Sequence, residues 1–228
     1  MLKMGWIMKQ TWEYVLFSHW NLEPEQVRDL IPAELELDLF DGKAWLTMLP
    51  FKVSHQRFRL LPEIPFLNRY LELNVRTYVK HRGKTGVYFF SLDANHLPSV
   101  LGARIASLPY RLARISMVEQ DQQFAFYCQQ VFDNGEFSVL YEPVGGPATT
   151  SKLGSLDHWL LERYYLFTKL GPLLLQGRIS HESWRVCGAN IKILANSISP
   201  VASAGEPQLV HFSPRKEAFI FPLKIVKG

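Results

Sequence analysis

The chain has 228 residues, of which 25 are Lys or Arg and 21 are Asp or Glu, so its formal net charge at pH 7 is +4. Hydrophobic residues make up 47% of the chain and aromatic residues 13%, and this composition excludes an intrinsically disordered protein. A chain of this length buries enough apolar surface to fold without a metal or a disulfide. We therefore expect a single domain over residues 1–228.

The basic residues are scattered, with no basic run and no basic amphipathic stripe, which predicts neither nucleic acid nor a membrane as a partner. No apolar run has the length of a signal-peptide core or a membrane span. Cys128 and Cys187 are far apart in sequence and are interpreted as free thiols, which favours a cytoplasmic protein. HExxH, CxxC and closely spaced His pairs are absent from the sequence, so we expect neither a metal nor a cofactor.

Alternating apolar and polar residues, and short apolar runs, predict that most of the chain forms strands. The predicted strands cover residues 35–39, 44–49, 70–79, 86–92, 184–194, 208–213 and 217–226. Asp41-Gly42 and Asn134-Gly135 are tight-turn pairs between such runs, and each predicts a hairpin. The stretches 143–155 and 195–207 are dense in Gly, Pro, Ser and Ala, which is typical of loops.

Helices are predicted at three places. A short one begins near Pro24 and ends at Pro32, and a second opens at Pro98 and ends before Pro109. The longest covers residues 156–170, after Ser155 as N-cap. We therefore expect an α+β fold that is mainly antiparallel β, with the sheet curled into a barrel or half-barrel.

The segment 70–79 carries the clearest chemical pattern. In a strand its even-numbered residues share one face, and that face carries Tyr70, Glu72, Asn74, Arg76 and Tyr78. In one interpretation this face is solvated and its ion pair contributes at most about 1 kcal/mol. In the other it lines an enclosed space, where a few convergent polar groups among aromatic residues define a ligand pocket. The residues alone favour these two interpretations about equally.

Further candidates are weaker. His19 and His181 lie beside aromatic residues, where a histidine is more often a structural hydrogen-bonding group than a base. Glu162 and Arg163 are adjacent on the predicted helix, and adjacent charges are usually on its solvated side.

At this point several segments resemble the YqjF-like family of uncharacterised bacterial proteins. They are residues 17–20, 31–45, 50–51, 72–79, 86–94, 162–164 and 181–184, in that order along the chain. The family is placed in the acetoacetate-decarboxylase-like superfamily. The resemblance implies a curved, largely antiparallel sheet that encloses a cavity, with a few short helices, and it implies that Glu72, Asn74 and Arg76 face this cavity.

True acetoacetate decarboxylases carry a lysine pair after a helix, and its first lysine forms a Schiff base with the substrate. In the similar segment of this chain Tyr110 and Arg111 occupy those positions. Schiff-base chemistry needs a neutral primary amine, which neither Arg nor Tyr supplies, so the resemblance implies a cavity without that reaction. Lys52, in an apolar run, is the alternative amine.

The resemblance leaves a set of candidate ligand-binding residues: Glu72, Asn74, Arg76, Tyr78, Tyr110, Arg111, Arg104 and His19. For Arg104 a salt bridge on its helix is favoured, whereas Arg111 is placed toward the cavity by the resemblance alone. Arginines suit the bidentate capture of a carboxylate or phosphate. The first hypothesis is thus a cavity that binds a small, anionic, partly apolar metabolite.

Two alternatives stay open. One is a lyase or dehydratase that uses another catalytic group, and the other is a non-catalytic protein that self-associates into a homo-oligomer. In the pocket interpretation Arg76 pairs with a buried carboxylate, so that Arg76→Ala would cost about 3–5 kcal/mol.

Overall fold

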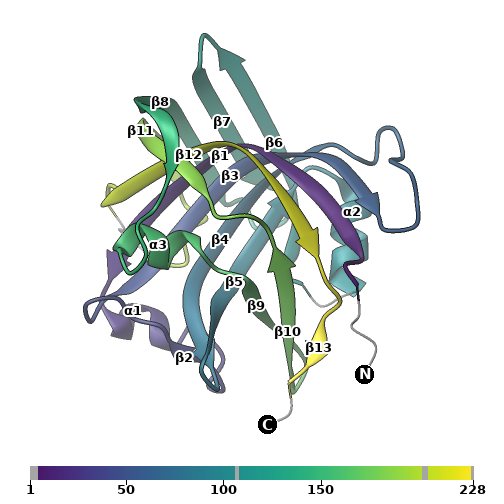
Figure 1. The fold of residues 1–228 in the computed structure, drawn as a ribbon, viewed down its shortest axis with the longest axis vertical. Coiled ribbons are helices and arrows are strands. Elements are labelled where there is room, and N and C mark those ends of the chain that lie inside the picture. The colour runs from purple at the N-terminus through teal and green to yellow at the C-terminus, as the bar shows by residue number, and fades with distance from the viewer. Residues whose placement is uncertain (1–4, 106–107, 202–204, 227–228) are drawn as a thin grey trace.

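The computed structural model describes residues 5–105, 108–201 and 205–226. Within them, thirteen strands form one continuous, strongly curved sheet, and three short helices lie at its margins (Figure 1). The strands are β1 (Met8–Leu22), β2 (Glu36–Leu37), β3 (Ala44–Phe58), β4 (Tyr70–His81), β5 (Lys84–Ala94), β6 (Tyr110–Gln120), β7 (Gln123–Gln130), β8 (Glu136–Thr150), β9 (Tyr165–Leu170), β10 (Leu173–Ser180), β11 (Arg185–Asn196), β12 (Leu209–Ile220) and β13 (Lys224–Ile225). The helices are α1 (Pro24–Arg28), α2 (Leu97–Ile105) and α3 (Leu156–Leu161).

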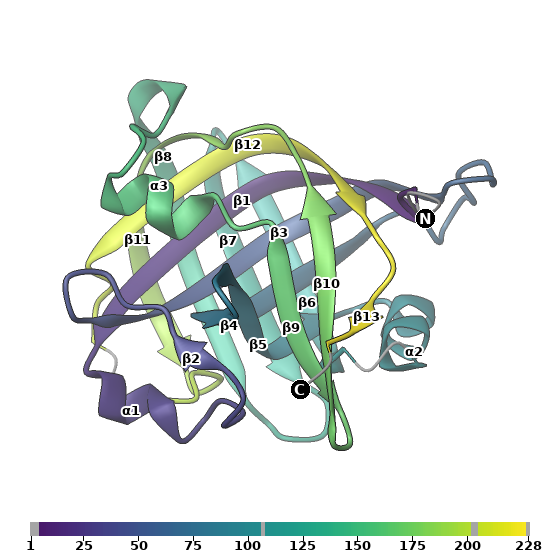
Figure 2. The same ribbon diagram turned by 60° about the horizontal axis from the view of Figure 1, so that its bottom comes forward.

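The sheet curls into two rings that share a wall. The first ring runs β1–β3–β4–β5–β9–β10–β12 and returns to β1, and Figure 2 shows β9 and β10 crossing in front of β4 and β5. Its closing contacts are short: β5 pairs with β9 over two residues, and so does β10 with β12. The ring is therefore a curved sheet rather than a regular barrel.

The second ring uses the other branch of the sheet, β6–β7–β8–β11, which leaves β5 and returns to β12. A tightly packed apolar core fills it, with Phe124, Phe126, Phe137, Tyr141 and Phe212 among its aromatic members. Phe124 stacks on Tyr141 with the ring centroids 4.8 Å apart. This ring contributes a solid interior, which stabilises the strands that the two rings share.

Strand β4 belongs to the shared wall, and its alternation separates the two interiors. Leu73 and Val75 pack into the aromatic core of the second ring. Glu72, Asn74 and Arg76 lie on the opposite face, inside the first ring. The two faces differ because successive side chains of a strand point to opposite sides of the sheet.

The α+β, mainly antiparallel fold predicted from the sequence is confirmed, but the predicted helix over 156–170 is wrong beyond its first turns. Helix α3 begins after Ser155, whose Oγ accepts from the backbone N–H of His158, and ends at Leu161. Residues Tyr165–Leu170 form β9, which pairs with β10 along its whole length. Tertiary pairing decided this segment, because its spacing of apolar residues fits a helix and a buried strand alike.

The turn predictions have mixed outcomes. Asn134-Gly135 joins β7 to β8 in a hairpin, as predicted. Asp41-Gly42 forms a tight turn with both residues at positive φ, and Phe40 and Lys43 pair across it, but the strand before it, β2, pairs with β4. The predicted loop 143–155 is wrong in its first half, because β8 continues to Thr150 and pairs with β11 there. Among the described residues, none of the helices is long and apolar enough to span a membrane.

Candidate functional site

A cavity of about 670 Å³ lies inside the first ring. Its wall is mostly apolar, with side chains from β3, β5, β9, β10 and the segment after β12. Polar and charged side chains line part of the wall, and one group of them lies on the β4 face and close to it, while others, Arg57 and Arg178 among them, come from β3 and β10. The side chains on and near β4 include Gln10, Glu72, Asn74, Arg76, Tyr110, Arg163 and His181. A mainly apolar cavity with a small convergent polar set is the usual form of a small-molecule site.

Glu72 is buried in this wall, and the Tyr110 hydroxyl donates to its Oε2 at 3.0 Å. Burial raises the pKa of the Glu72 carboxyl to about 8, with hydrogen bonds from Tyr110 and Asn74 offsetting part of the shift and the charge of Asp93 adding to it. At neutral pH the carboxyl is therefore mostly protonated. A neutral carboxylic acid can donate a proton or a hydrogen bond to a bound molecule.

A short hydrogen-bond network supports this end of the cavity. Tyr70 Oη accepts from Gln10 Nε2 and donates to Gln56 Oε1, each at 3.0 Å.

Burial, together with the charge of Glu72, raises the pKa of the Tyr110 hydroxyl well above its usual value. Tyr110 is consequently a neutral hydrogen-bond donor across the physiological range.

Arg76 is half-buried, and its guanidinium lies 5.9 Å from the Phe17 ring and 5.7 Å from the Tyr78 ring. Its Nη2 makes one long hydrogen bond of 3.5 Å to the carbonyl of Leu160. Its buried Nε has no hydrogen-bond partner, and Arg76 has no carboxylate within ion-pair distance among the residues that the structure describes. Arg76 is thus a cation in the cavity wall with free donors.

The expected pairing of Arg76 with a buried carboxylate is wrong, and strand geometry gives the reason. Residues 72 and 76 share a face of β4, but four residues of extended strand separate their backbones by about 13 Å. The Glu72 carboxyl instead accepts a hydrogen bond from Tyr110 on β6, which lies on the far side of β5.

Arg163 is the cavity residue that the sequence interpretation missed. It lies just after α3, where its Nη1 donates to Asp38 Oδ2 at 2.6 Å and its Nε to the carbonyl of Trp159 at 2.6 Å. Its buried Nη2 has no partner in the described structure. Its guanidinium lies 5.1 Å from the Tyr78 ring, so that Arg76 and Arg163 flank the same aromatic side chain. In the sequence, the resemblance at residues 162–164 is the signal for this residue, whereas two adjacent charges on a predicted helix are typical of its solvated side.

Tyr78 and His19 are fully buried and lie outside the cavity wall. Tyr78 Oη contacts Thr47 Oγ1 at 2.7 Å, and Thr47 contacts His19 Nδ1 at 2.9 Å. The chain continues from His19 Nε2 to His211 at 3.2 Å and from His211 to Asp157 on α3 at 3.2 Å. Burial lowers the pKa of His19 well below its usual value, so this histidine is an uncharged structural group.

Of the remaining residues that the sequence singles out, one lines the cavity and three do not. Tyr110 lines the cavity, whereas Arg111 points to the other side of β6 and pairs with Asp133 at 2.8 Å, because consecutive strand residues face opposite sides. Arg104 is exposed on α2 and donates to the carbonyl of Tyr110 at 2.8 Å. Lys52 also lies outside the wall, paired with Glu13 at 3.2 Å.

A curved sheet that encloses such a cavity is the acetoacetate-decarboxylase-like fold. An acetoacetate decarboxylase-like enzyme from Sphingomonas wittichii RW1 matches 97% of this chain and 94% of its own with a TM-score of 0.68 at 12% identity. The acetoacetate decarboxylase from Legionella pneumophila covers 98% and 86% with a TM-score of 0.64, also at 12% identity. The enduracididine biosynthesis enzyme MppR, complexed with pyruvate, covers 99% and 92% with a TM-score of 0.65 at 10% identity.

Within this fold the chain belongs to the DUF2071 family, described as an uncharacterized conserved protein, whose model matches residues 9–217. It is 39% identical over 224 residues to the uncharacterized protein YqjF of Bacillus subtilis (strain 168), which is 96% of this chain and 92% of that protein. The resemblance to the YqjF-like family seen in the sequence is therefore confirmed.

The raised pKa of Glu72 predicts a pH-dependent contribution to stability. The folded state keeps a proton that the unfolded chain loses above pH about 4.5, so the contribution is full below that pH and is lost as the pH rises to about 8. Over this window the free energy of unfolding of the wild type should fall by at most about 5 kcal/mol relative to Glu72→Gln. Denaturant titrations at several pH values measure the difference. The exposed Glu119→Gln variant is the control and should follow the wild type; parallel profiles of wild type and Glu72→Gln would contradict the burial of this carboxyl.

Arg76 and Arg163 should differ in their effect on stability. Arg163→Met leaves the buried carboxylate of Asp38 unpaired and should lower the free energy of unfolding by about 3–5 kcal/mol. Arg76→Met leaves no carboxylate behind and should change it by less than about 1 kcal/mol. Equilibrium unfolding of both variants checks this, and equal losses would show that Arg76 has an ion-pair partner after all.

Proposed function

We propose that this protein binds a small, partly apolar metabolite through a carboxylate, in the cavity of the first ring. The observation that carries the proposal is the guanidinium of Arg76, which lies in the cavity wall with a buried Nε that has no partner. A buried polar group is normally hydrogen-bonded, and a guanidinium fits a carboxylate in a bidentate geometry.

The surroundings of Arg76 support an anion in particular. Arg163 contributes a second unpartnered buried group, Nη2, and its guanidinium lies 5.1 Å from the Tyr78 ring, which Arg76 also contacts. Glu72, the carboxylate on the same β4 face, is mostly protonated at neutral pH and so does not repel an anion. Because a phosphate group also fits two guanidinium groups, phosphorylated acids belong to the same candidate class.

The apolar part of the wall supports a ligand with an apolar body. Leu49, Phe51, Val87, Phe89 and Leu166 line the cavity and offer no hydrogen-bonding side chains, and the first two pair directly with Asn74 and Glu72 on β4. Burying an apolar body against them contributes roughly 25 cal/mol per Å² of surface removed from water. The ligand class is thus a carboxylic acid with a hydrocarbon portion.

Binding in this proposal does not use an amine. The part of the cavity wall that the structure describes contains no lysine, and Lys52 is paired with Glu13 outside the wall. Tyr110 and Arg111 stand where the resemblance to the decarboxylases puts the lysine pair, and neither carries a primary amine. One fold neighbour, MppR, is described in complex with pyruvate, which makes 2-keto acids a reasonable first set of probes.

A thermal-shift screen against keto, hydroxy and phosphorylated acids tests the proposal, because a ligand of the folded state raises the melting temperature. For a hit, Arg76→Met should weaken binding about 10- to 100-fold by calorimetry, as expected for losing a charged hydrogen-bond donor. Arg111→Met removes the same charge outside the cavity and should bind like the wild type. The absence of any acid that binds, or equal losses in both variants, would contradict the site.

A second candidate function is acid–base catalysis on the bound acid, of the lyase or dehydratase type. The observation that favours it is the protonated Glu72, with a pKa near neutrality and the Tyr110 hydroxyl at 3.0 Å. A group with such a pKa serves well as a general acid or base.

Proton exchange separates catalysis from simple binding. With a 2-keto acid that binds, the wild type in D₂O should incorporate deuterium at the carbon next to the carbonyl, as followed by NMR. Glu72→Gln should slow this exchange at least about 100-fold while the acid still binds. If the protein does not speed deuterium incorporation above the rate in buffer alone, the result contradicts acid–base catalysis and leaves binding as the function of the cavity.

A further inference from the structure

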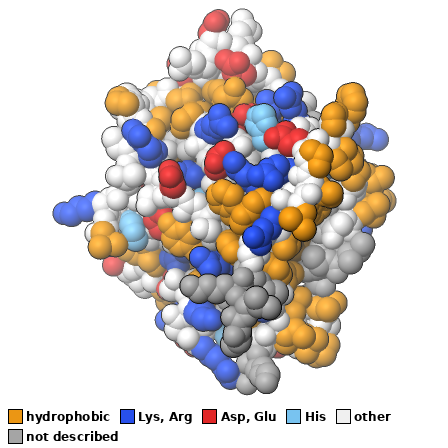
Figure 3. All heavy atoms as spheres, turned by 45° about the vertical axis from the view of Figure 1, so that its right-hand side comes forward, with side chains coloured by type: hydrophobic (Ala, Val, Ile, Leu, Met, Phe, Trp, Pro, Cys, Tyr) orange, Lys and Arg blue, Asp and Glu red, His pale blue; other side chains and the backbone are white. Residues whose placement is uncertain are grey.

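The segment between β3 and β4 forms an apolar projection at the cavity mouth. We call residues Phe58–Leu67 the rim loop. Its exposed large side chains are Phe58, Leu60, Leu61, Ile64, Phe66 and Leu67, and two of them, Leu60 and Phe66, are 91% and 93% exposed. Hydrophobic side chains gather on the side of the molecule that carries this loop and α2 (Figure 3). Exposed apolar surface of this kind marks an interaction site.

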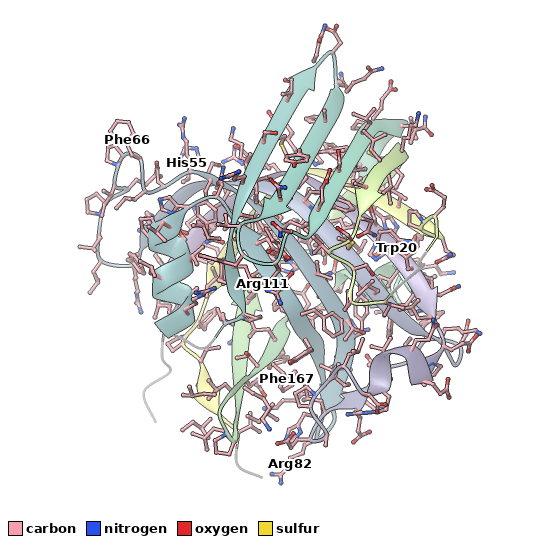
Figure 4. All side chains as sticks on the ribbon, turned by 180° about the vertical axis from the view of Figure 1, so that it is seen from behind. Trp20, His55, Phe66, Arg82, Arg111 and Phe167 are labelled. Atoms are coloured by element: carbon pink, nitrogen blue, oxygen red, sulfur yellow. The ribbon has the colours of Figure 1, made fainter. Side chains whose placement is uncertain are left out.

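The rim loop faces in two directions. Phe58, Pro62, Ile64 and Leu67 contribute to the cavity wall, so the loop forms part of the cavity opening. Phe66 lies at the outer end of the loop, and Figure 4 shows it projecting away from the sheet. Its φ of 68° is in the left-handed region, which is unfavourable for a bulky residue. The loop therefore holds this ring in solvent at a conformational cost.

Basic residues flank the apolar tip. Residues 57–69 contain three arginines, Arg57, Arg59 and Arg69, and one acidic residue, Glu63. The guanidinium groups of Arg57 and Arg59 lie over the Trp6 ring, at 5.1 and 5.9 Å from its centroid. Tryptophan and arginine beside an apolar tip are typical of segments at a membrane–water interface.

The acidic group of the loop is already engaged within it. Asn68 Nδ2 donates to Glu63 Oε2 at 2.8 Å, and His55 contacts the same carboxylate at 3.2 Å. These contacts lower the pKa of Glu63, with the hydrogen bond from Asn68 as the main cause. The carboxylate is therefore charged and held within the loop, and the three arginines outnumber it, which leaves residues 57–69 with a formal charge of +2.

We propose that the rim loop docks on an anionic lipid membrane. Leu60, Leu61 and Phe66 insert among the acyl chains near the headgroups, while Arg57 and Arg59 contact lipid phosphates. The positive tip is the reason for choosing a membrane over a second copy of the chain, since a symmetric contact would bring the same arginines face to face. The cavity opening then lies against the lipid surface, from which a partly apolar acid can enter.

The sequence interpretation excluded a membrane because the basic residues form no run. In the structure, however, Arg57, Arg59 and Arg69 lie at the two ends of the rim loop, and the exposed apolar residues of the loop lie between them. The proposal concerns docking at the surface, and it is independent of whether the cavity binds an acid.

Vesicle co-sedimentation with the full chain tests the proposal. The wild type should bind vesicles of equal parts phosphatidylglycerol and phosphatidylcholine, bind phosphatidylcholine alone at least tenfold more weakly, and lose affinity as salt is added. The double variant Leu60→Ser/Phe66→Ser should lose at least tenfold in affinity at an unchanged melting temperature, because both side chains are already in solvent. Leu153→Ser, an exposed leucine in the loop before α3, should bind like the wild type.

Three results would overturn the proposal. They are the absence of vesicle binding by the wild type, equal vesicle binding by the wild type and the double variant, and a homodimer seen by light scattering that dissociates in the double variant. The last result would assign the rim loop to contact between copies.

Discussion

The ion pair between Asp38 and Arg163 holds the charged end of the cavity together. Asp38 lies between β2 and β3, and Arg163 lies between α3 and β9, so the ion pair joins these two connections. Both side chains are almost completely buried. A buried charge without its partner would cost several kcal/mol of stability, so the chain at Arg163 is held close to Asp38. This contact sets the path of the chain from the end of α3 to the start of β9. The carbonyl groups of α3 that contact Arg163 and Arg76 are placed by the same connection.

Much of the sheet could be predicted because its signals are local. The alternation over residues 70–79 gave β4 with the correct faces, and Asn134-Gly135 gave the β7–β8 hairpin. The segment 165–170 could not be predicted in this way. Its strand exists because β5 and β10 lie on either side of it, and that pairing is invisible in a spacing of apolar residues that suits a helix equally well.

The site was predictable to the extent that it lies on one strand. Alternation puts Glu72, Asn74 and Arg76 on one face of β4, and the family resemblance implied that this face lines the cavity, where the structure has all three. Arg163 could not be found like this, since its place depends on Asp38, 125 residues away in sequence. Arg111 shows the limit of resemblance: it occupies a position adjacent to Tyr110, and only one of two neighbours on a strand can face the cavity.

Substitutions on the two faces of β4 should have different consequences, because each face belongs to a different ring. A substitution at position 72, 74 or 76 changes the wall of the cavity in the first ring, whereas one at 73 or 75 changes the packed core of the second. The chemistry of the cavity wall can therefore change while the core that supports the strand stays the same. Solved structures share this fold at 10–12% identity, so the two-ring sheet accommodates very different sequences.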